Sequence, residues 1–371
     1  MQTVITTERG YDEFLEYLHH AGMKKILVVC GNSCSQLDIG KFLDELIRQG
    51  KIDVVYFREF APNPDYSSVV KGVDTFRKNN CDSILAIGGG SAIDVAKCIK
   101  LYVTMPEGCD YLHEPVVPNS IPFVAVPTTA GTGSEATRFA VVYYKGEKQS
   151  VTDVSSIPQA VLFDASTLAS LPPYHRKSTM MDAFCHAVES FWSVNSNEES
   201  QSFSKSAIRL ILENSSSYLM NEPSGNKKML EAANLAGKAI NISQTTAGHA
   251  MCYKLTSLYG IAHGHAASLC VSALWPYMIS HKENCADPRG TSYLSQMFED
   301  LAESMGEQTP EAAAEKFKKF VDGLSLEKPS IRTVGDFDIL KKSVNPVRLK
   351  NNPIKLDESA IETLYHQILG E

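Results

Sequence analysis

Strand-like and helix-like segments alternate regularly through the first 165 residues of this 371-residue chain. Runs rich in Val, Ile and Leu, such as KKILVVC (24–30) and SILAIGGG (83–90), are each followed by apolar residues at helical spacing. Parallel strands need a long crossover connection, and a helix usually supplies it. The alternation therefore predicts a doubly wound α/β domain. The expected strands are 24–30, 53–57, 83–90, 121–129, 138–144 and 159–164.

The pattern changes at DASTLASLPP (164–173). Beyond it, period-2 runs almost disappear, and long segments with apolar residues at helical spacing follow one another. We therefore expect two domains: residues 1–165 as an α/β nucleotide-binding domain, and residues 166–371 as an all-helical domain.

The composition excludes several classes of protein. The net charge is −8, which argues against binding to a nucleic-acid backbone. The nine cysteines are scattered without a CxxC pair, as in reduced cytosolic proteins. The sequence has no secretory signal pattern and no apolar run of the ~20 residues that a membrane helix needs. We expect a cytoplasmic protein with no membrane or nucleic-acid partner.

Two glycine-rich loops follow expected strands. GGGSAIDVAK (88–97) joins a strand to a helix, and its glycines let backbone N–H groups approach an anion at a helix N-terminus. On this stretch alone, a pyrophosphate site and a plain tight turn are equally good interpretations. PTTAGTGSEAT (127–137) follows another strand and should lie at the same sheet edge, where α/β folds bind ligands. The two loops together favour a nucleotide site.

Asp182 and His186 are four residues apart in STMMDAFCHAVES (178–190), so they share one helix face about 6 Å apart along the axis. Their neighbours are apolar, and a buried ionised carboxylate needs a partner. A simple Asp–His hydrogen bond would satisfy this pair. A second apolar stretch, 245–266, adds His249, His263 and His265, and such side chains are ligands of Fe²⁺ or Zn²⁺. Periodicity leaves open whether His263 or His265 would bind.

These motifs, in this order, resemble the iron-containing alcohol dehydrogenase family over essentially the whole chain. The matching stretches are GGGSAIDVAK, PTTAGTGSEAT, DAFCHAVES and the pair His249 and His263 before Gly264. The resemblance implies a dehydroquinate-synthase-like fold and Fe²⁺, with Zn²⁺ as the other possible metal. It also implies metal ligands at Asp182, His186, His249 and His263, which leaves His265 outside the metal shell.

The resemblance further implies contacts to a nicotinamide cofactor in the α/β domain. The residues that match are Gly89, Gly90, Ser91, Asp94, Thr128, Thr129, Thr132 and Lys148. Two departures from the family pattern matter. Gly31 and Asn32 follow the first strand, where many members carry an Asp that repels a 2′-phosphate, so we favour NADP(H) over NAD(H). Tyr253 stands where many members have another His, and its role is left open.

The stretches 174–200 and 343–365 resemble a narrower subgroup, the phosphonoacetaldehyde reductases, which make 2-hydroxyethylphosphonate. A dianionic substrate would need Arg or Lys near the metal. Arg176, Lys254 and Arg348 are the candidates, and for each the alternative is a solvated surface charge. The implied reaction is hydride transfer between a nicotinamide and an aldehyde, with a divalent cation polarising the carbonyl. The family also suggests a homodimer.

Three other functions stay open from the sequence. One is a general iron-dependent alcohol or diol dehydrogenase acting on another small aldehyde or alcohol. A second is a dehydroquinate-synthase-like lyase, for which several Lys and Arg should converge on the metal. A third is a nucleotide- and metal-binding regulator without catalysis.

Overall fold

The computed structural model describes residues 2–333 and 335–370. The chain forms two compact units: Met1–Leu171 with Asn221–Leu230, and Pro172–Met220 with Glu231–Glu371. The short segment 221–230 therefore returns to the first unit. There, the Asn221 side-chain amide donates to the Ala169 carbonyl at 2.9 Å.

Six parallel strands form the sheet of the first unit, in the order β1-β9-β6-β5-β3-β4. In register, Leu27 lies opposite Val55 on one side and Ile84 on the other. Strands covered on both faces are apolar throughout, which is why most of them could be recognised in the sequence. The predicted α/β class is confirmed. The bounds are β1 Thr3–Thr6, β3 Lys25–Cys30, β4 Asp53–Phe57, β5 Ser83–Gly88, β6 Phe123–Pro127 and β9 Ala160–Phe163.

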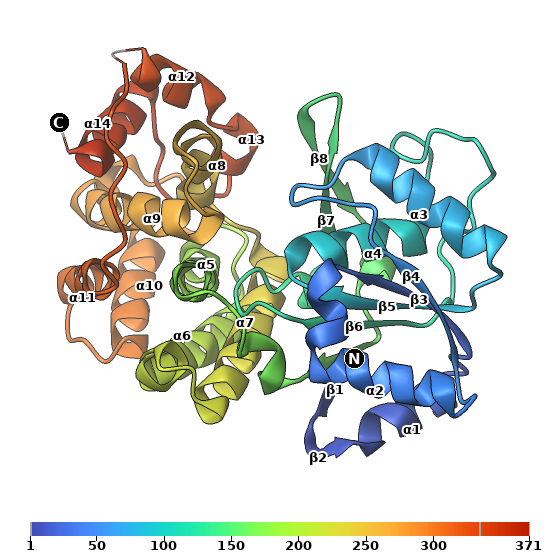
Figure 1. Ribbon diagram of the computed structural model, residues 1–371. Coiled ribbons are helices and arrows are strands. Elements are labelled where there is room, and N and C mark those ends of the chain that lie inside the picture. The colour runs from blue at the N-terminus through green and yellow to red at the C-terminus, as the bar shows by residue number, and fades with distance from the viewer. Residues whose placement is uncertain (1, 334, 371) are drawn as a thin grey trace. The chain divides into compact units, whose positions relative to one another are not determined.

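Helices cover both faces of this sheet (Figure 1). On one face, Ile26 and Val28 pack with residues of α1 (Asp12–His20) and α2 (Asp38–Arg48). On the other, Leu27 and Val29 pack with residues of α3 (Tyr66–Lys78) and α4 (Gly90–Tyr102). Because side chains alternate along a strand, the single run KILVVC supplies the core on both faces.

One expected strand lies outside the sheet. β7 (Phe139–Tyr144) pairs antiparallel with β8 (Glu147–Thr152) in a separate hairpin. The turn residues Lys145 and Gly146 both have positive φ, 52° and 79°, as a tight hairpin turn requires. β8 is mostly polar and exposed, so it gave no apolar signal. β2 (Glu8–Tyr11) was also missed in the sequence, for the same reason.

The second unit is helical, as predicted, and no strand occurs among its described residues. Helix α5 is mostly buried and packs against α6 and α9. α7 begins in the segment that returns to the first unit and ends in the second. The bounds are α5 Pro173–Trp192, α6 Glu198–Leu219, α7 Pro223–Ser243, α8 Ala247–Tyr259, α9 His263–Ser280, α10 Thr291–Ser304, α11 Pro310–Gly323, α12 Asp336–Ser343, α13 Pro346–Leu349 and α14 Glu358–Leu369.

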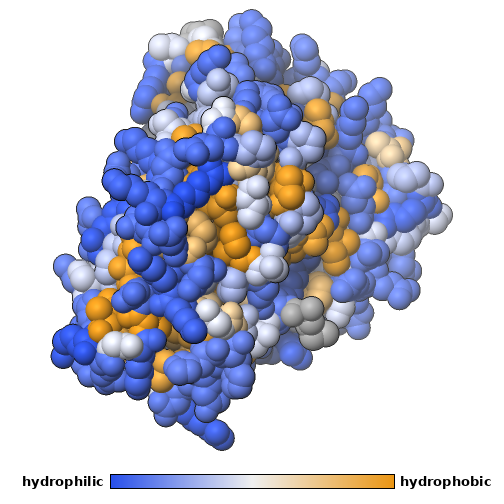
Figure 2. Space-filling model, turned by 90° about the vertical axis from the view of Figure 1, so that its right-hand side faces the viewer, coloured by the Kyte–Doolittle hydropathy of each residue, from blue (hydrophilic) through white to orange (hydrophobic). Residues whose placement is uncertain are grey.

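The face in Figure 2 is mostly hydrophilic, with hydrophobic side chains exposed in patches between polar ones. Individually exposed apolar residues include Val117, Val154 and Met220. Across residues 2–333 and 335–370, no helix is both long and apolar enough to cross a membrane.

Candidate metal centre and nucleotide loops

Helix α5 carries Asp182 and His186 on one buried face. The helix begins with Pro173 in its first turn, where the missing N–H costs nothing, and no Gly or Pro interrupts it afterwards. His186 Nε2 lies 3.8 Å from Asp182 Oδ1, and the two side chains are 8% and 4% exposed. The α5 face therefore presents a carboxylate and an imidazole inside the helical unit.

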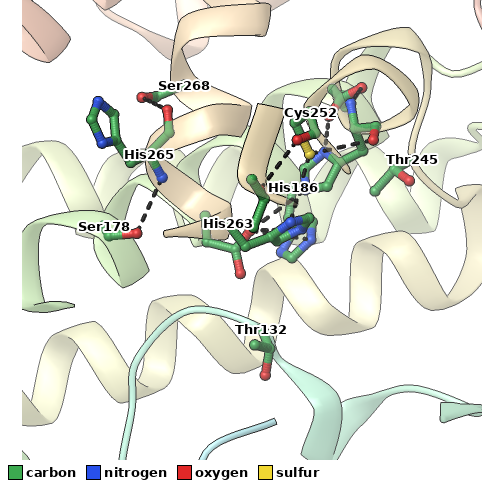
Figure 3. Close-up of polar contacts among 12 residues, drawn as sticks. Thr132, Ser178, His186, Thr245, Cys252, His263, His265 and Ser268 are labelled. Carbon is green, nitrogen blue, oxygen red and sulfur yellow. Dashed lines mark hydrogen bonds and ion pairs between the residues drawn. The ribbon is translucent and has the colours of Figure 1, made fainter. Parts of the chain in front are cut away.

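Two further histidines reach the same carboxylate oxygen from other helices. His249, in the first turn of α8, places Nε2 3.5 Å from Asp182 Oδ1. His263, the first residue of α9, places Nε2 3.8 Å from it. Ligand atoms of Asp182, His249 and His263 all lie within 4.8 Å of one another. Figure 3 shows the side chains of His186 and His263 converging. The four residues expected to bind metal are thus gathered in one place.

A glycine allows this gathering. Gly264 follows His263, and a Cβ at that position would collide with the Ser178 carbonyl oxygen of α5. The same Cβ would lie only 2.7 Å from Asp182 Cβ and 2.8 Å from Asp182 N. Only a residue without a side chain lets the start of α9 approach α5 this closely.

Glu189 is a functional candidate that the sequence reasoning missed. It has no exposed surface, and its Oε2 faces His249 Nδ1 at hydrogen-bonding distance. Its Oε1 accepts from the Thr246 hydroxyl at 2.6 Å, the Thr246 N–H at 3.1 Å and the His249 N–H at 3.2 Å. The signal was present: Asp182, His186 and Glu189 follow the i, i+4, i+7 spacing of a single helix face.

The charges of this group are strongly coupled. Burial would raise the pKa of Asp182, but the rings of His186, His263 and His249 hold it well below its usual range. Burial would likewise lower the pKa of His249, but Glu189 and Asp182 together raise it to about 9. Glu189 keeps a lowered pKa despite its burial, because His249 and Thr246 stabilise the carboxylate. The centre therefore holds two buried carboxylates in ionised form.

The donor set fits a divalent cation. Asp182 Oδ1 and His249 Nε2 are buried, and neither has a hydrogen-bond partner among residues 2–333 and 335–370. Buried polar atoms normally have a hydrogen-bond or metal partner, so two such atoms 3.5 Å apart are suited to share one bound cation. One carboxylate with imidazoles suits Fe²⁺ or Zn²⁺. His263 is 36% exposed, so the group is accessible on that side.

His265 lies apart from the group, and Figure 3 shows it turned away from His186 and His263. The backbone N–H of His265 donates to the Ser178 hydroxyl at 3.1 Å, and the ring Nδ1 lies 3.2 Å from the Tyr174 hydroxyl. Burial lowers the pKa of its ring. The structure thus gives His265 a packing role between α5 and α9.

The three basic residues considered for the substrate lie in different surroundings. The buried Arg176 donates to the Tyr218 carbonyl at 2.9 Å, and its guanidinium covers the Tyr218 ring, so it supports α6. Lys254 is half-buried on α8. Arg348 donates to the Thr245 hydroxyl at 2.9 Å and lies 5.3 Å from the Tyr253 ring. That ring stacks on His263 with centroids 5.4 Å apart.

In the first unit, the two glycine-rich loops meet at the carboxyl edge of the sheet. The Thr128 N–H donates to the Gly88 carbonyl at 3.0 Å. A Cβ on Gly89 would lie 3.1 Å from Thr129 Oγ1, and one on Gly90 would lie 3.0 Å from Thr132 Cγ2. Gly90 and Ser91 open helix α4, so their N–H groups belong to its free N-terminus. The two loops thus adjoin at the start of α4, as expected, and their binding of an anion stays a prediction.

Other residues expected to contact a cofactor are placed differently. Asp94 Oδ1 accepts from the Ser134 hydroxyl at 2.5 Å, and Oδ2 accepts from the Val141 N–H at 3.0 Å. Asp94 therefore ties α4 to the second loop and to β7. Lys148 lies exposed on β8. Gly31 and Asn32 form the turn directly after β3.

Comparison with known proteins decides the family. Residues 2–165 match the model of the family "Iron-containing alcohol dehydrogenase", and residues 177–369 match that of "Fe-containing alcohol dehydrogenase family, C-terminal". The chain belongs to the iron-containing alcohol dehydrogenase family. It is therefore an oxidoreductase of the alcohol dehydrogenase type rather than a lyase, and the predicted enzyme class is confirmed.

Individual relatives of this alcohol dehydrogenase are named for different substrates. A phosphonoacetaldehyde reductase of Streptomyces viridochromogenes is 31% identical, covering 80% of this chain and 77% of its own length. A 1,3-propanediol dehydrogenase of Citrobacter freundii is 34% identical, covering 78% and 73%. The crystal structure of a sulfoacetaldehyde reductase from Bifidobacterium kashiwanohense with NAD+ is 26% identical, with a TM-score of 0.87 over 99% of this chain and 97% of that one.

Proposed function

We propose that this enzyme reduces a small anionic aldehyde, phosphonoacetaldehyde, to 2-hydroxyethylphosphonate with NADPH and a bound Fe²⁺ ion. The observation that supports it is the grouping of Asp182, His249 and His263 beside a half-buried Arg348. When bound, the cation would polarise the carbonyl and the reduced nicotinamide would supply the hydride.

The residues of this chain have defined parts in that reaction. Asp182, His186, His249 and His263 would hold the cation. The N–H groups at the start of α4 would bind the cofactor pyrophosphate, with Gly89 and Gly90 leaving room for it.

Arg348 would bind the phosphonate. Its guanidinium is one aromatic ring away from His263, and no carboxylate of the described residues forms an ion pair with it. A guanidinium left without a counter-ion in a half-buried site is suited to an oxyanion. Arg176, by contrast, is occupied by Tyr218.

The preference for NADPH rests on the turn after β3. Gly31 and Asn32 place no carboxylate where one would repel a 2′-phosphate. Arg58 is exposed just beyond the end of β4, and its guanidinium lies over the Tyr56 ring at 4.5 Å. Because Val29 of β3 faces Phe57 of β4, Arg58 stands at the same carboxyl edge as the turn after β3. It is a cation of the kind that accommodates such a phosphate.

Anaerobic protein loaded with Fe²⁺ tests the proposal through the loss of NADPH or NADH absorbance. We expect phosphonoacetaldehyde to be reduced with a higher kcat/KM than butanal. In Arg348→Gln, kcat/KM for phosphonoacetaldehyde should fall about 10- to 100-fold, because a charge-assisted hydrogen bond is lost. Butanal reduction should be unchanged, and the exposed Lys350→Gln should leave both unchanged.

A general alcohol or diol dehydrogenase is the second candidate, favoured by the 34% identity to the 1,3-propanediol dehydrogenase. Equal kcat/KM for butanal and phosphonoacetaldehyde, with no effect of Arg348→Gln, would establish it and exclude the phosphonate substrate. Absence of any aldehyde reduction with either cofactor would contradict both.

A further inference from the structure

We propose that Glu189 is a positioning residue that fixes the ring of His249 with its Nδ1–H toward α5 and its Nε2 lone pair toward the cation. This inference rests on the metal site of the proposed function and extends it to a residue outside the ligand set. It is carried by the direction of every hydrogen bond around the Glu189 carboxylate.

In each hydrogen bond to Glu189 Oε1, the partner is the donor and the oxygen is the acceptor. The N–H groups of Thr246 and His249 can only donate. The Thr246 hydroxyl accepts from the Trp192 indole N–H at 2.9 Å, so its own hydrogen points to Glu189, 2.6 Å away. Three donors thus converge on one oxygen and hold Glu189 as an acceptor-only carboxylate.

Three donors on one oxygen stabilise the ionised carboxylate, whose second oxygen, Oε2, also accepts, and the partner of Oε2 is His249 Nδ1. Nδ1 lies within hydrogen-bonding distance of that acceptor and carries the proton, whereas Nε2 has no hydrogen-bond partner among the described residues, so Nε2 is left as the metal ligand. Nε2 is the atom that points at Asp182 Oδ1. The hydrogen bond also sets the angle of the ring, because the backbone of His249 donates to the same carboxylate.

The residue at position 248 leaves space for the Glu189 carboxylate. A Cβ on Gly248 would lie 3.1 Å from Glu189 Cδ and 2.7 Å from a methyl group of Val271. Glycine at 248 therefore leaves the space that the carboxylate fills against the first turn of α8.

The test exploits the single acceptor oxygen of glutamine. In Glu189→Gln, the amide oxygen can satisfy the three donors of Thr246 and His249 only if its NH₂ faces His249 Nδ1. That orientation favours the proton on Nε2, where it competes with the cation. We expect the affinity of the metal-free protein for Zn²⁺, measured by competition with a chelator, to fall about 10- to 100-fold.

Two variants separate positioning from general damage. Glu189→Asp keeps two acceptor oxygens and should recover part of the affinity. Ser190→Ala removes a neighbouring buried hydrogen bond of α5, from the Ser243 hydroxyl, without touching His249, and should keep wild-type affinity. In Zn²⁺-loaded wild type, the His249 ring N–H held by a carboxylate should give a downfield proton NMR signal, which Glu189→Gln loses.

Wild-type Zn²⁺ affinity in Glu189→Gln, or an equal loss in Ser190→Ala, would overturn the inference. Neither measurement uses an aldehyde. The inference can therefore fail while the proposed reaction stands, and the reaction can fail while the role of Glu189 stands.

Discussion

Lys97 has no exposed surface, although it belongs to the stretch GGGSAIDVAK that opens α4. Its ammonium donates to the carbonyls of Thr137 and Phe139, each at 2.7 Å, and so ties α4 to the end of the second glycine-rich loop. Burial lowers its pKa to about 8, although Asp94 and Glu135 oppose the shift. A charge is thus kept inside the first unit to hold a loop.

This lysine predicts a pH dependence of stability. Between the folded pKa of about 8 and the ordinary value of 10.5, the unfolded chain carries a proton that the folded chain has lost. Raising the pH through that window therefore favours the folded state. We expect the unfolding temperature of wild type, relative to Lys97→Met, to rise from about pH 7 to about pH 10. The prediction would be contradicted if the difference in unfolding temperature between wild type and Lys97→Met did not change with pH. It would also be contradicted if the difference between wild type and the exposed variant Lys41→Met showed the same trend.

Some site residues could be found from the sequence and others could not. Asp182 and His186 could, because a helix converts a spacing of four directly into a shared face. The choice between His263 and His265 could not be made from periodicity, because both begin α9 and only the approach to α5 separates them. Arg176 could not be assigned either, since its partner Tyr218 lies 42 positions away in sequence.

At the scale of elements, the crossing of α5 and α9 at Gly264 is the critical contact. Gly264→Ala places a methyl group against the Ser178 carbonyl and the Asp182 backbone, so α9 must move away from α5. Because His263 is the neighbouring residue, we expect the affinity for Zn²⁺ to fall at least about 10-fold, with a loss of about 1–3 kcal/mol in stability.

Gly323→Ala is the matched control for that substitution. Gly323 ends α11, and a Cβ there would meet nothing within 4 Å. The affinity of Gly323→Ala for Zn²⁺ should equal that of wild type in the same chelator competition. If Gly264→Ala bound Zn²⁺ as tightly as Gly323→Ala, the close approach would not be what brings His263 to Asp182.

The predictability of elements followed burial. β3, β5 and β6 are covered on both faces and appear in the sequence as unbroken apolar runs. The exposed strand β8 has the mostly polar sequence EKQSVT, which lacks the apolar pattern by which a strand is recognised. The turn of its hairpin depends on positive φ angles at Lys145 and Gly146. Positive φ in hairpin turns is typical of Asn, Asp and Gly, so a lysine does not predict it.

At the scale of the whole molecule, all four candidate metal ligands come from the second unit, on α5, α8 and α9. Removing the metal should therefore loosen that unit selectively. We expect a chelator to speed amide hydrogen exchange in these three helices and to leave the strands β3, β5 and β6 protected. A ligand at 100 times its Kd stabilises by about 2.7 kcal/mol, so the unfolding temperature should fall as well.

His263→Ala provides the control for this experiment, since a protein that no longer holds the cation should not respond to the chelator. Equal acceleration of exchange in both units of wild type would show that the metal does not act through α5, α8 and α9.

The two glycine-rich loops and the turn at Gly31 lie in the first unit, whereas every candidate ligand lies in the second. A recombination event that exchanged residues 2–165 for those of a relative would leave all four ligand candidates in their own sequence context. On the proposed assignment of these residues, the choice of dinucleotide and the choice of metal are encoded in separate parts of the sequence, so evolution or engineering can vary one without changing the other.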